Sequence, residues 1–284
     1  MSATPDAVAR AFRDACLAEL DALKPGNVHC YCDEDSMMLV DFEASAAAAA
    51  PPIAAPKVSV GTRIRLAVEA TKSAVGHNTN LGIILLAAPL ATAALDAGGG
   101  GLRSRLSNIL AGLSVEDAEQ AYAAIRHAGP GGLGNAAEHD VASPPTVSLI
   151  EAMRAAETRD RIAWNYSHDF VDIFDLGLPR LEQGVAHWGM GPWTVTFLYL
   201  GFLAQIPDTL IERKHGSRVA ASLLEEAAPI EASLAAAETP EAMRAPLLAF
   251  DRSLKERGLN PGTSADLTVA TLFAAALRGL QKGC

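Results

Sequence analysis

Residues 81–95 read Leu-Gly-Ile-Ile-Leu-Leu-Ala-Ala-Pro-Leu-Ala-Thr-Ala-Ala-Leu, an apolar run in which Thr92 carries the only hydroxyl. Alanine and leucine are among the strongest helix formers, so this run predicts a helix over about 80–96. A helix that crosses a membrane needs about 20 strongly apolar residues, and this run is shorter. The sequence therefore predicts an apolar helix of a globular protein and no membrane partner.

The same helix-forming composition continues on both sides of this run. Alanine, leucine, glutamate and arginine dominate, and β-branched runs bounded by turn residues are absent apart from Trp193–Thr196. Ser114 stands three residues before Asp117, a spacing close to that of a capping box at a helix start. We predict an all-α fold, with a single domain over residues 1–284 and roughly ten to twelve helices. The predicted helices cover residues 5–22, 40–50, 60–75, 80–96, 102–112, 115–127, 146–163, 165–182, 190–205, 215–236, 240–257 and 264–281.

The overall composition excludes several classes of protein. Hydrophobic residues make up 50% of the 284 residues, enough for a buried core, and the formal net charge is −10. Nucleic-acid backbones attract basic surfaces, so this balance argues against a nucleic-acid partner while leaving room for a small phosphorylated ligand. The first residues lack a secretion signal, and four cysteines are too few for a disulfide scaffold. We therefore expect a reduced, cytoplasmic setting.

The first polar stretch between predicted helices is Lys24–His29, Lys-Pro-Gly-Asn-Val-His. A lysine beside a Pro-Gly turn is held by a stiff backbone with exposed N–H groups, an arrangement that suits a phosphate or a carboxylate. If Lys24 is exposed in this way, replacing it should weaken phosphate binding much more than it lowers stability. An ordinary turn between helices also explains these residues when they are taken alone.

A second polar stretch, Gly76–Gly82, leads directly into the apolar helix. Asn78, Thr79 and Asn80 are all residue types that cap helices, and one cap is enough. The remaining side chains would stand at a helix N-terminus, which favours anions. The sequence is compatible with either role for this stretch, helix capping or ligand binding. Replacing Gly82 by valine should mainly destabilise the protein, because it would crowd the start of the helix.

Two further stretches lie in the last third of the chain. In Pro207–Lys214 an aspartate, Asp208, stands where it would cap a short helix, and Arg213 and Lys214 follow within reach of carboxylates. The stretch Leu259–Asp266 opens the last predicted helix with glycine, hydroxyls and a carboxylate. Backbone N–H groups there could hold an anion, and Asp266 could hold a metal bound to that anion; a simple capping motif is the alternative. The side chains and glycine concerned are Gly262, Ser264 and Asp266.

The sequence contains two groups of candidate metal ligands. Asp169 and Asp172 are three residues apart on a predicted helix, and a pair of acids facing a cleft is a common Mg²⁺ arrangement. A solvated acidic face explains them as well. His29, Cys30 and Cys32 lack a second pair of ligands at zinc-finger spacing, so structural zinc is not expected.

Taken together and in this order, the polar stretches indicate a protein family more specifically than any one of them does. The chain resembles the triphosphoribosyl-dephospho-CoA synthase family, an all-α family whose members build the precursor of the prosthetic group of citrate lyase or malonate decarboxylase. The resemblance implies that adenine leaves C1 of the ribose of ATP and that a hydroxyl of dephospho-CoA takes its place. The similar segments span about residues 7 to 280 and are Lys24–His29, Asp41–Ser45, Asn78–Gly82, Pro207–Ile211 and Pro261–Asp266.

The resemblance also implies roles for individual residues, with ATP and Mg²⁺ as substrate and cofactor. Catalysis would involve Asp208, Asp266 and His29, and Mg²⁺ would be held by Asp266 and Asp208, with Asp169 and Asp172 as further acids. The nucleotide would contact Lys24, Gly26, Asn27, Asn78, Thr79, Asn80, Arg213, Lys214, Gly262 and Ser264.

The chain departs from the pattern of the better-known members in two places. Asn80 and Leu81 stand where those members have histidine and lysine, and Cys32–Met37 replaces a Gly-Ala-His-x-Asp-Met motif. These differences are typical of a separate branch. Its reaction could instead be another nucleotide-dependent group transfer in the biosynthesis of a one-carbon carrier coenzyme, and a non-catalytic nucleotide-binding protein is the third alternative. The sequence is also compatible with a homodimer.

Overall fold

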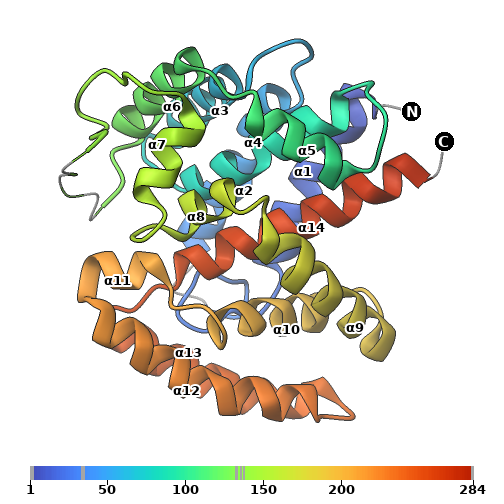
Figure 1. The fold of residues 1–284 in the computed structure, drawn as a ribbon. Helices are drawn as coiled ribbons and strands as arrows, with labels where there is room; N and C mark the ends of the chain where they lie inside the picture. The colour runs from blue at the N-terminus through green and yellow to red at the C-terminus, as the bar shows by residue number, and fades with distance from the viewer. Residues whose placement is uncertain (1–2, 33–35, 132–133, 135, 137, 283–284) are drawn as a thin grey trace.

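The computed structural model describes residues 3–32, 36–131, 134, 136 and 138–282, and within these ranges the chain is helical without a strand (Figure 1). The all-α prediction is therefore confirmed for the described residues, whereas the single-domain prediction stays a prediction. The helices are α1 (Pro5–Leu20), α2 (Ser36–Ile53), α3 (Val60–Val75), α4 (Leu81–Leu95), α5 (Leu102–Ala111), α6 (Val115–Ala128), α7 (Leu149–Ala156), α8 (Arg161–Ser167), the π-helical η2 (Asp172–Gly177), α9 (Leu178–Trp188), α10 (Pro192–Leu203), α11 (Thr209–His215), α12 (Ser217–Ala235), the 3-10 helix η3 (Pro240–Met243), α13 (Arg244–Glu256) and α14 (Gly262–Lys282).

Helix α4 is the apolar helix that the sequence predicts, and it lies inside the protein. Almost all of its residues are buried, because α1, α2, α3, α5 and α14 pack around it. A helix that is apolar on every face is stable in water only when it is covered on every face. Among the described residues no helix is long and apolar enough to span a bilayer.

Two apolar clusters form the interior. The larger one joins α1 to α8 with one face of α14, and the smaller one joins α10 to α13. Figure 1 shows α14 (red) running between these two groups of helices. Helices α10 and α14 contribute residues to both clusters, so the N-terminal end of α14 lies where the two groups meet.

The predicted helices 146–163 and 165–182 are wrong as continuous helices. Asp160 accepts hydrogen bonds from the backbone N–H groups of Ile162 and Ala163, and so starts a new helix, α8, after α7 has ended. Asp169 and Phe170 then adopt positive φ angles of 49° and 55°, which a right-handed helix excludes. These breaks, together with the short α11, give fourteen α-helices in the described chain, where the sequence predicts ten to twelve.

Candidate functional site

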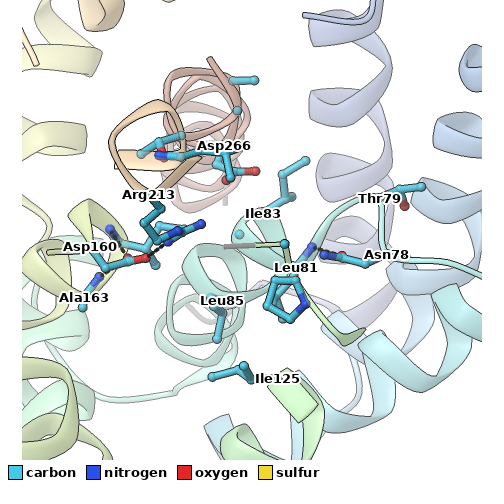
Figure 2. Close-up of a pocket in the computed structure, with 18 of the residues that line it drawn as sticks. Asn78, Thr79, Leu81, Ile83, Leu85, Ile125, Asp160, Ala163, Arg213 and Asp266 are labelled. Atoms are coloured by element: carbon cyan, nitrogen blue, oxygen red, sulfur yellow. Dashed lines mark hydrogen bonds and ion pairs between the residues drawn. The ribbon is translucent and has the colours of Figure 1, made fainter. Parts of the chain in front are cut away.

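A cavity of about 480 Å³ lies where the N-terminal ends of α4, α8, α11 and α14 approach one another. In Figure 2, Asp266 stands at one end of the cavity and Ile125 at the other, with Leu85 between them. The ion pair of Asp160 with Arg213 occupies one side. The lining includes Glu19, Asn27, Asn78, Thr79, Leu81, Gly82, Leu85, Tyr122, Ile125, Arg159, Asp160, Arg213, Lys214, Asn260, Gly262 and Asp266.

The loop Lys24–His29 packs directly against residues 259–261 before α14. Gly26 has a φ of 80°, and a Cβ on it would lie 2.7 Å from the carbonyl oxygen of Leu259, so only glycine fits here. The Asn27 amide nitrogen donates to the Asn260 amide oxygen at 2.8 Å. Two sequence stretches more than two hundred residues apart therefore meet at the cavity wall.

Lys24 does not have the exposed position that the sequence suggests. Its side chain is fully buried and does not line the cavity. Its Nζ forms an ion pair with Glu19 at 2.6 Å and donates to the carbonyl oxygen of Val28 at 2.6 Å. The prediction that this lysine is exposed is wrong, because its side chain folds back onto Glu19 near the end of α1.

His29 is likewise buried and lies away from the cavity lining. Its Nδ1 accepts a hydrogen bond from the Tyr31 N–H, and its Nε2 lies 3.2 Å from Oδ1 of Asp251 in α13. The same Asp251 oxygen accepts the Gly26 N–H at 2.8 Å. Burial alone would raise the pKa of Asp251, but His29 and the Gly26 N–H outweigh burial and hold that pKa below its ordinary value. His29 thus anchors the loop to α13.

The stretch Asn78–Gly82 forms the start of α4 at the cavity. Asn78 Oδ1 accepts the N–H of Leu81 at 3.1 Å, and Thr79 Oγ1 donates to Ser45 Oγ at 2.7 Å. Asn80 is buried and does not line the cavity, and its amide nitrogen has no hydrogen-bond partner among the described residues. Asn78 and Thr79 therefore face the cavity as the sequence predicts, and Asn80 does not.

Asp208 joins the starts of two helices. Its Oδ1 accepts the N–H groups of Leu210 and Ile211, and its Oδ2 accepts both the N–H and the hydroxyl of Ser264, at 2.8 and 2.9 Å. Burial raises the pKa of this carboxyl, and the four donors oppose that increase. Asp208 and Ser264 are both buried and absent from the cavity lining, so each acts on the site through the position of α11 and α14.

Asp266 is the predicted carboxylate that faces the cavity (Figure 2). It lies against the first turn of α4, where a Cβ on Gly82 would stand only 2.0 Å from its Oδ2. Within the described chain its carboxyl oxygens have no hydrogen-bond partner. Burial raises its pKa well above the ordinary value, and the negative charges of Asp208, Glu19 and Asp160 raise it further. A carboxylate with a raised pKa is a stronger base than that of an ordinary aspartate.

The remaining predicted acids do not reach the cavity. Asp172 is buried, and its two carboxyl oxygens lie 2.7 and 2.8 Å from the guanidinium of Arg161. Asp169 is exposed and outside the cavity lining. No three His, Cys, Asp or Glu side chains among the residues that the structure describes are grouped so that they could hold a metal. The acidic residues 33–35, which belong to the stretch Cys32–Met37, lie outside the described residues.

The structure thus brings seven of the predicted residues to one cavity and leaves eight outside it, two of which are the acids Asp169 and Asp172. The seven are Asn27, Asn78, Thr79, Arg213, Lys214, Gly262 and Asp266, and the other six outside are Lys24, Gly26, His29, Asn80, Asp208 and Ser264. Sequence reasoning missed Glu19, Arg159 and Asn260. Glu19 and Arg159 have no local signal, whereas Asn260 stands inside the stretch Leu259–Asp266 and could have been included.

Comparisons with known proteins identify one family. A family model described as CitG, ATP:dephospho-CoA triphosphoribosyl transferase, matches residues 5–284. Among solved structures, the chain is similar to one from Archaeoglobus fulgidus described as a "putative triphosphoribosyl-dephospho-coA synthase". The two chains share 26% sequence identity with a TM-score of 0.63, over 83% of this chain and 98% of that one. No curated protein matches the sequence.

Proposed function

The chain belongs to the CitG family of ATP:dephospho-CoA triphosphoribosyl transferases, and from this premise we propose that the cavity at the starts of α4 and α14 is its active site. The chain is accordingly a transferase of the triphosphoribosyl-dephospho-CoA synthase type. One observation carries the assignment of the site. Four stretches that are distant in the sequence contribute to one cavity around a carboxyl, Asp266, that no described protein group bonds.

The reaction makes clear demands on such a cavity. The bond between ribose C1 and adenine breaks, a bond between C1 and an acceptor oxygen forms, and the hydroxyl proton of the acceptor must be removed. We assign this proton to Asp266, whose raised pKa makes it a stronger base than an ordinary aspartate. While ionised, the same carboxylate stabilises the positive charge that develops on the ribose as adenine leaves. Asn78 and Thr79, on the side of the cavity across from the Asp160–Arg213 ion pair, would orient the ribose.

Mg²⁺ is a further part of the proposal. Asp266 is the predicted ligand that faces the cavity, and Asp208 has both carboxyl oxygens occupied by hydrogen bonds. Mg²⁺ in nucleotide sites is held largely by phosphate oxygens and water, with one or two carboxylates. The residues present fit an ion that enters with the triphosphate, for which Asp266 supplies the nearby carboxylate. Bound there, Mg²⁺ would neutralise part of the phosphate charge.

The test is direct detection of adenine. The full chain, incubated with ATP, Mg²⁺ and dephospho-CoA, is expected to release free adenine, and Asp266→Asn is expected to lower the rate by at least about a hundredfold. Release of ADP, AMP or phosphate instead of adenine would contradict the proposed chemistry. Unchanged adenine release by Asp266→Asn would contradict the assignment of the base.

A second candidate function differs from the first only in the compound that accepts the ribosyl group. Leu81 lines the cavity where the better-known members have a lysine, so one cation is missing from the wall that would face an acceptor phosphate. This favours an acceptor with fewer phosphates, such as an intermediate of a one-carbon carrier coenzyme. Adenine release that requires a hydroxyl compound other than dephospho-CoA would support this candidate.

A further inference from the structure

The arginine and lysine residues of the cavity all stand at one edge. Arg159 lies in the connection before α8, and Arg213 and Lys214 lie in α11. Arg213 forms an ion pair with Asp160. Arg159 and Lys214 are exposed, and within the described part of the chain neither takes part in an ion pair.

Arg159 and Lys214 both line the cavity next to the same ion pair. Asp160 and Arg213 are paired, and Arg159 and Lys214 are their immediate neighbours in the sequence. The N–H of Arg161 also donates to Thr209 Oγ1 at 3.2 Å, which ties the start of α8 to the start of α11. The two free cations therefore flank a closed ion pair, one just before the start of α8 and the other in the last turn of α11, a helix whose start is tied to that of α8.

The charge of Asp160 is already neutralised at this edge. Besides pairing with Arg213, Asp160 accepts the N–H groups at the start of α8. Asp140 comes within electrostatic reach of Arg159, but it bonds the backbone N–H groups of Ala136 and Ala142 instead of pairing with the arginine. The edge consequently carries a net positive charge in a chain whose formal net charge is −10.

The other walls of the cavity are poor places for a polyphosphate. At the start of α4 the carboxyl of Asp266 stands against Gly82, and a carboxylate cannot hold phosphate oxygens directly, because it approaches them only with Mg²⁺ between. Asn78 already uses its oxygen to cap α4. Leu85 and Ile125 themselves are apolar and offer a phosphate no charge-assisted hydrogen bond.

We infer that Arg159 and Lys214 form the triphosphate subsite of the cavity, so that the nucleotide enters with its phosphates at the α8–α11 edge and its ribose toward Asp266. This inference rests on the proposed function for the identity of the ligand. It adds Arg159, which no sequence motif marks, as a substrate-binding residue, and it leaves Asp266 in reach of the phosphates through Mg²⁺ alone.

The experiment uses inorganic tripolyphosphate as the probe and the full chain as the protein, with binding measured by titration calorimetry. Arg159→Ala and Lys214→Ala are each expected to weaken tripolyphosphate binding roughly tenfold or more, because each removes a charge-assisted contact. Arg154→Ala and Arg218→Ala are matched controls, since both arginines are exposed and lie outside the cavity lining. Both controls are expected to bind like the unchanged chain.

The same variants are then assayed for adenine release. Arg159→Ala should raise KM for ATP by about the factor that it loses in tripolyphosphate binding, with KM for the acceptor unchanged. If the unchanged chain releases no adenine but tripolyphosphate binding still depends on Arg159 and Lys214, the subsite stands and the proposed reaction is wrong. If Arg159→Ala and Lys214→Ala bind tripolyphosphate like the controls, the subsite is wrong whatever the reaction proves to be.

Discussion

The loop Lys24–His29 and the junction of α4 with α14 are both built from conspicuous polar residues, yet they differ in where their hydrogen bonds go. In the loop, Lys24 is paired with Glu19, and His29 faces Asp251. At the junction, Asp266 has no bonding partner among the described residues and faces the cavity. Polar groups that are satisfied within the protein hold it together, and those left unsatisfied beside a cavity are available to a ligand.

This contrast makes Lys24→Met the substitution with the largest expected effect on stability. The substitution leaves Glu19 buried without its cation, and breaking a buried ion pair in this way typically costs about 3–5 kcal/mol. Urea unfolding would measure the change in the free energy of unfolding. Lys214→Met is the control, because an exposed lysine should change that free energy by less than about 0.5 kcal/mol.

The double variant Lys24→Met with Glu19→Leu sharpens the Lys24 prediction. Removing both charges should recover part of the lost stability, since the cost comes from the unpaired carboxylate. If Lys24→Met unfolded at the same urea concentration as the unchanged chain, the loop would not be the structural anchor described above.

Gly82→Ala tests the junction, where activity should suffer more than stability. A Cβ at this position would stand 2.0 Å from Asp266 Oδ2 and 2.8 Å from Ile162 Cδ1, and the aspartate can escape by rotating its side chain. We expect about 1 kcal/mol of destabilisation. Adenine release should fall by about a hundredfold, because a reacting group displaced by about 1 Å loses that much.

The Gly82 result is compared with that of a nearby glycine. Gly76→Ala is the control, because a Cβ there meets nothing within 4 Å, although its φ of 82° also makes alanine unfavourable. It should lower stability without a matching loss of activity. A parallel loss of both properties in Gly82→Ala would restore the sequence-based expectation that Gly82 matters mainly for packing.

Asp266→Asn is expected to make the protein more stable, with a gain that depends on pH. Burial and neighbouring acids raise the pKa of Asp266 in the folded state above its unfolded value of about 3.9. Above pH about 4 the unfolded chain therefore loses this proton more readily than the folded chain, and stability falls as pH rises toward the folded-state pKa. Asparagine has no such proton, so the advantage of the variant should grow with pH over this window and then level off.

The measurement for Asp266→Asn is urea unfolding at several pH values. Asp266→Glu retains an ionisable carboxyl and should keep the pH dependence of the unchanged chain. Equal stability of Asp266→Asn and the unchanged chain at every pH would mean that Asp266 finds a partner in solution, which would argue against its role as the reacting group.

Helix positions were predictable where the signals are local. The capping box at Ser114 and Asp117 is present, and α3 and α4 begin and end within one residue of their predicted bounds. The break at Asp169 and Phe170 was not predictable, because a left-handed backbone at a non-glycine residue depends on surrounding contacts. The break at Asp160 does have a local signal, since aspartate is a residue type that caps helices.

The site was predictable in part for the same reason. Asp266 stands in a polar helix start, so its type and position mark it. Arg159 and Glu19 carry no such mark, because only the fold brings the end of α1 and the connection before α8 to one cavity. The burial of Lys24 could not be predicted either, since a lysine beside Pro-Gly has the same local pattern whether it points to solvent or folds back onto Glu19.

The smallest expected effect concerns Asp169, which the sequence offered as a Mg²⁺ ligand. It is exposed, lies outside the cavity lining and has a positive φ of 49°. Asp169→Gly should stabilise the protein by up to about 1 kcal/mol, because glycine adopts this backbone conformation without strain. Asp169→Ala should be less stable than the unchanged chain, since alanine tolerates the conformation less well than aspartate. Both variants should keep the Mg²⁺ dependence of adenine release, and a shift of that dependence in either one would place the metal near η2 instead of at Asp266.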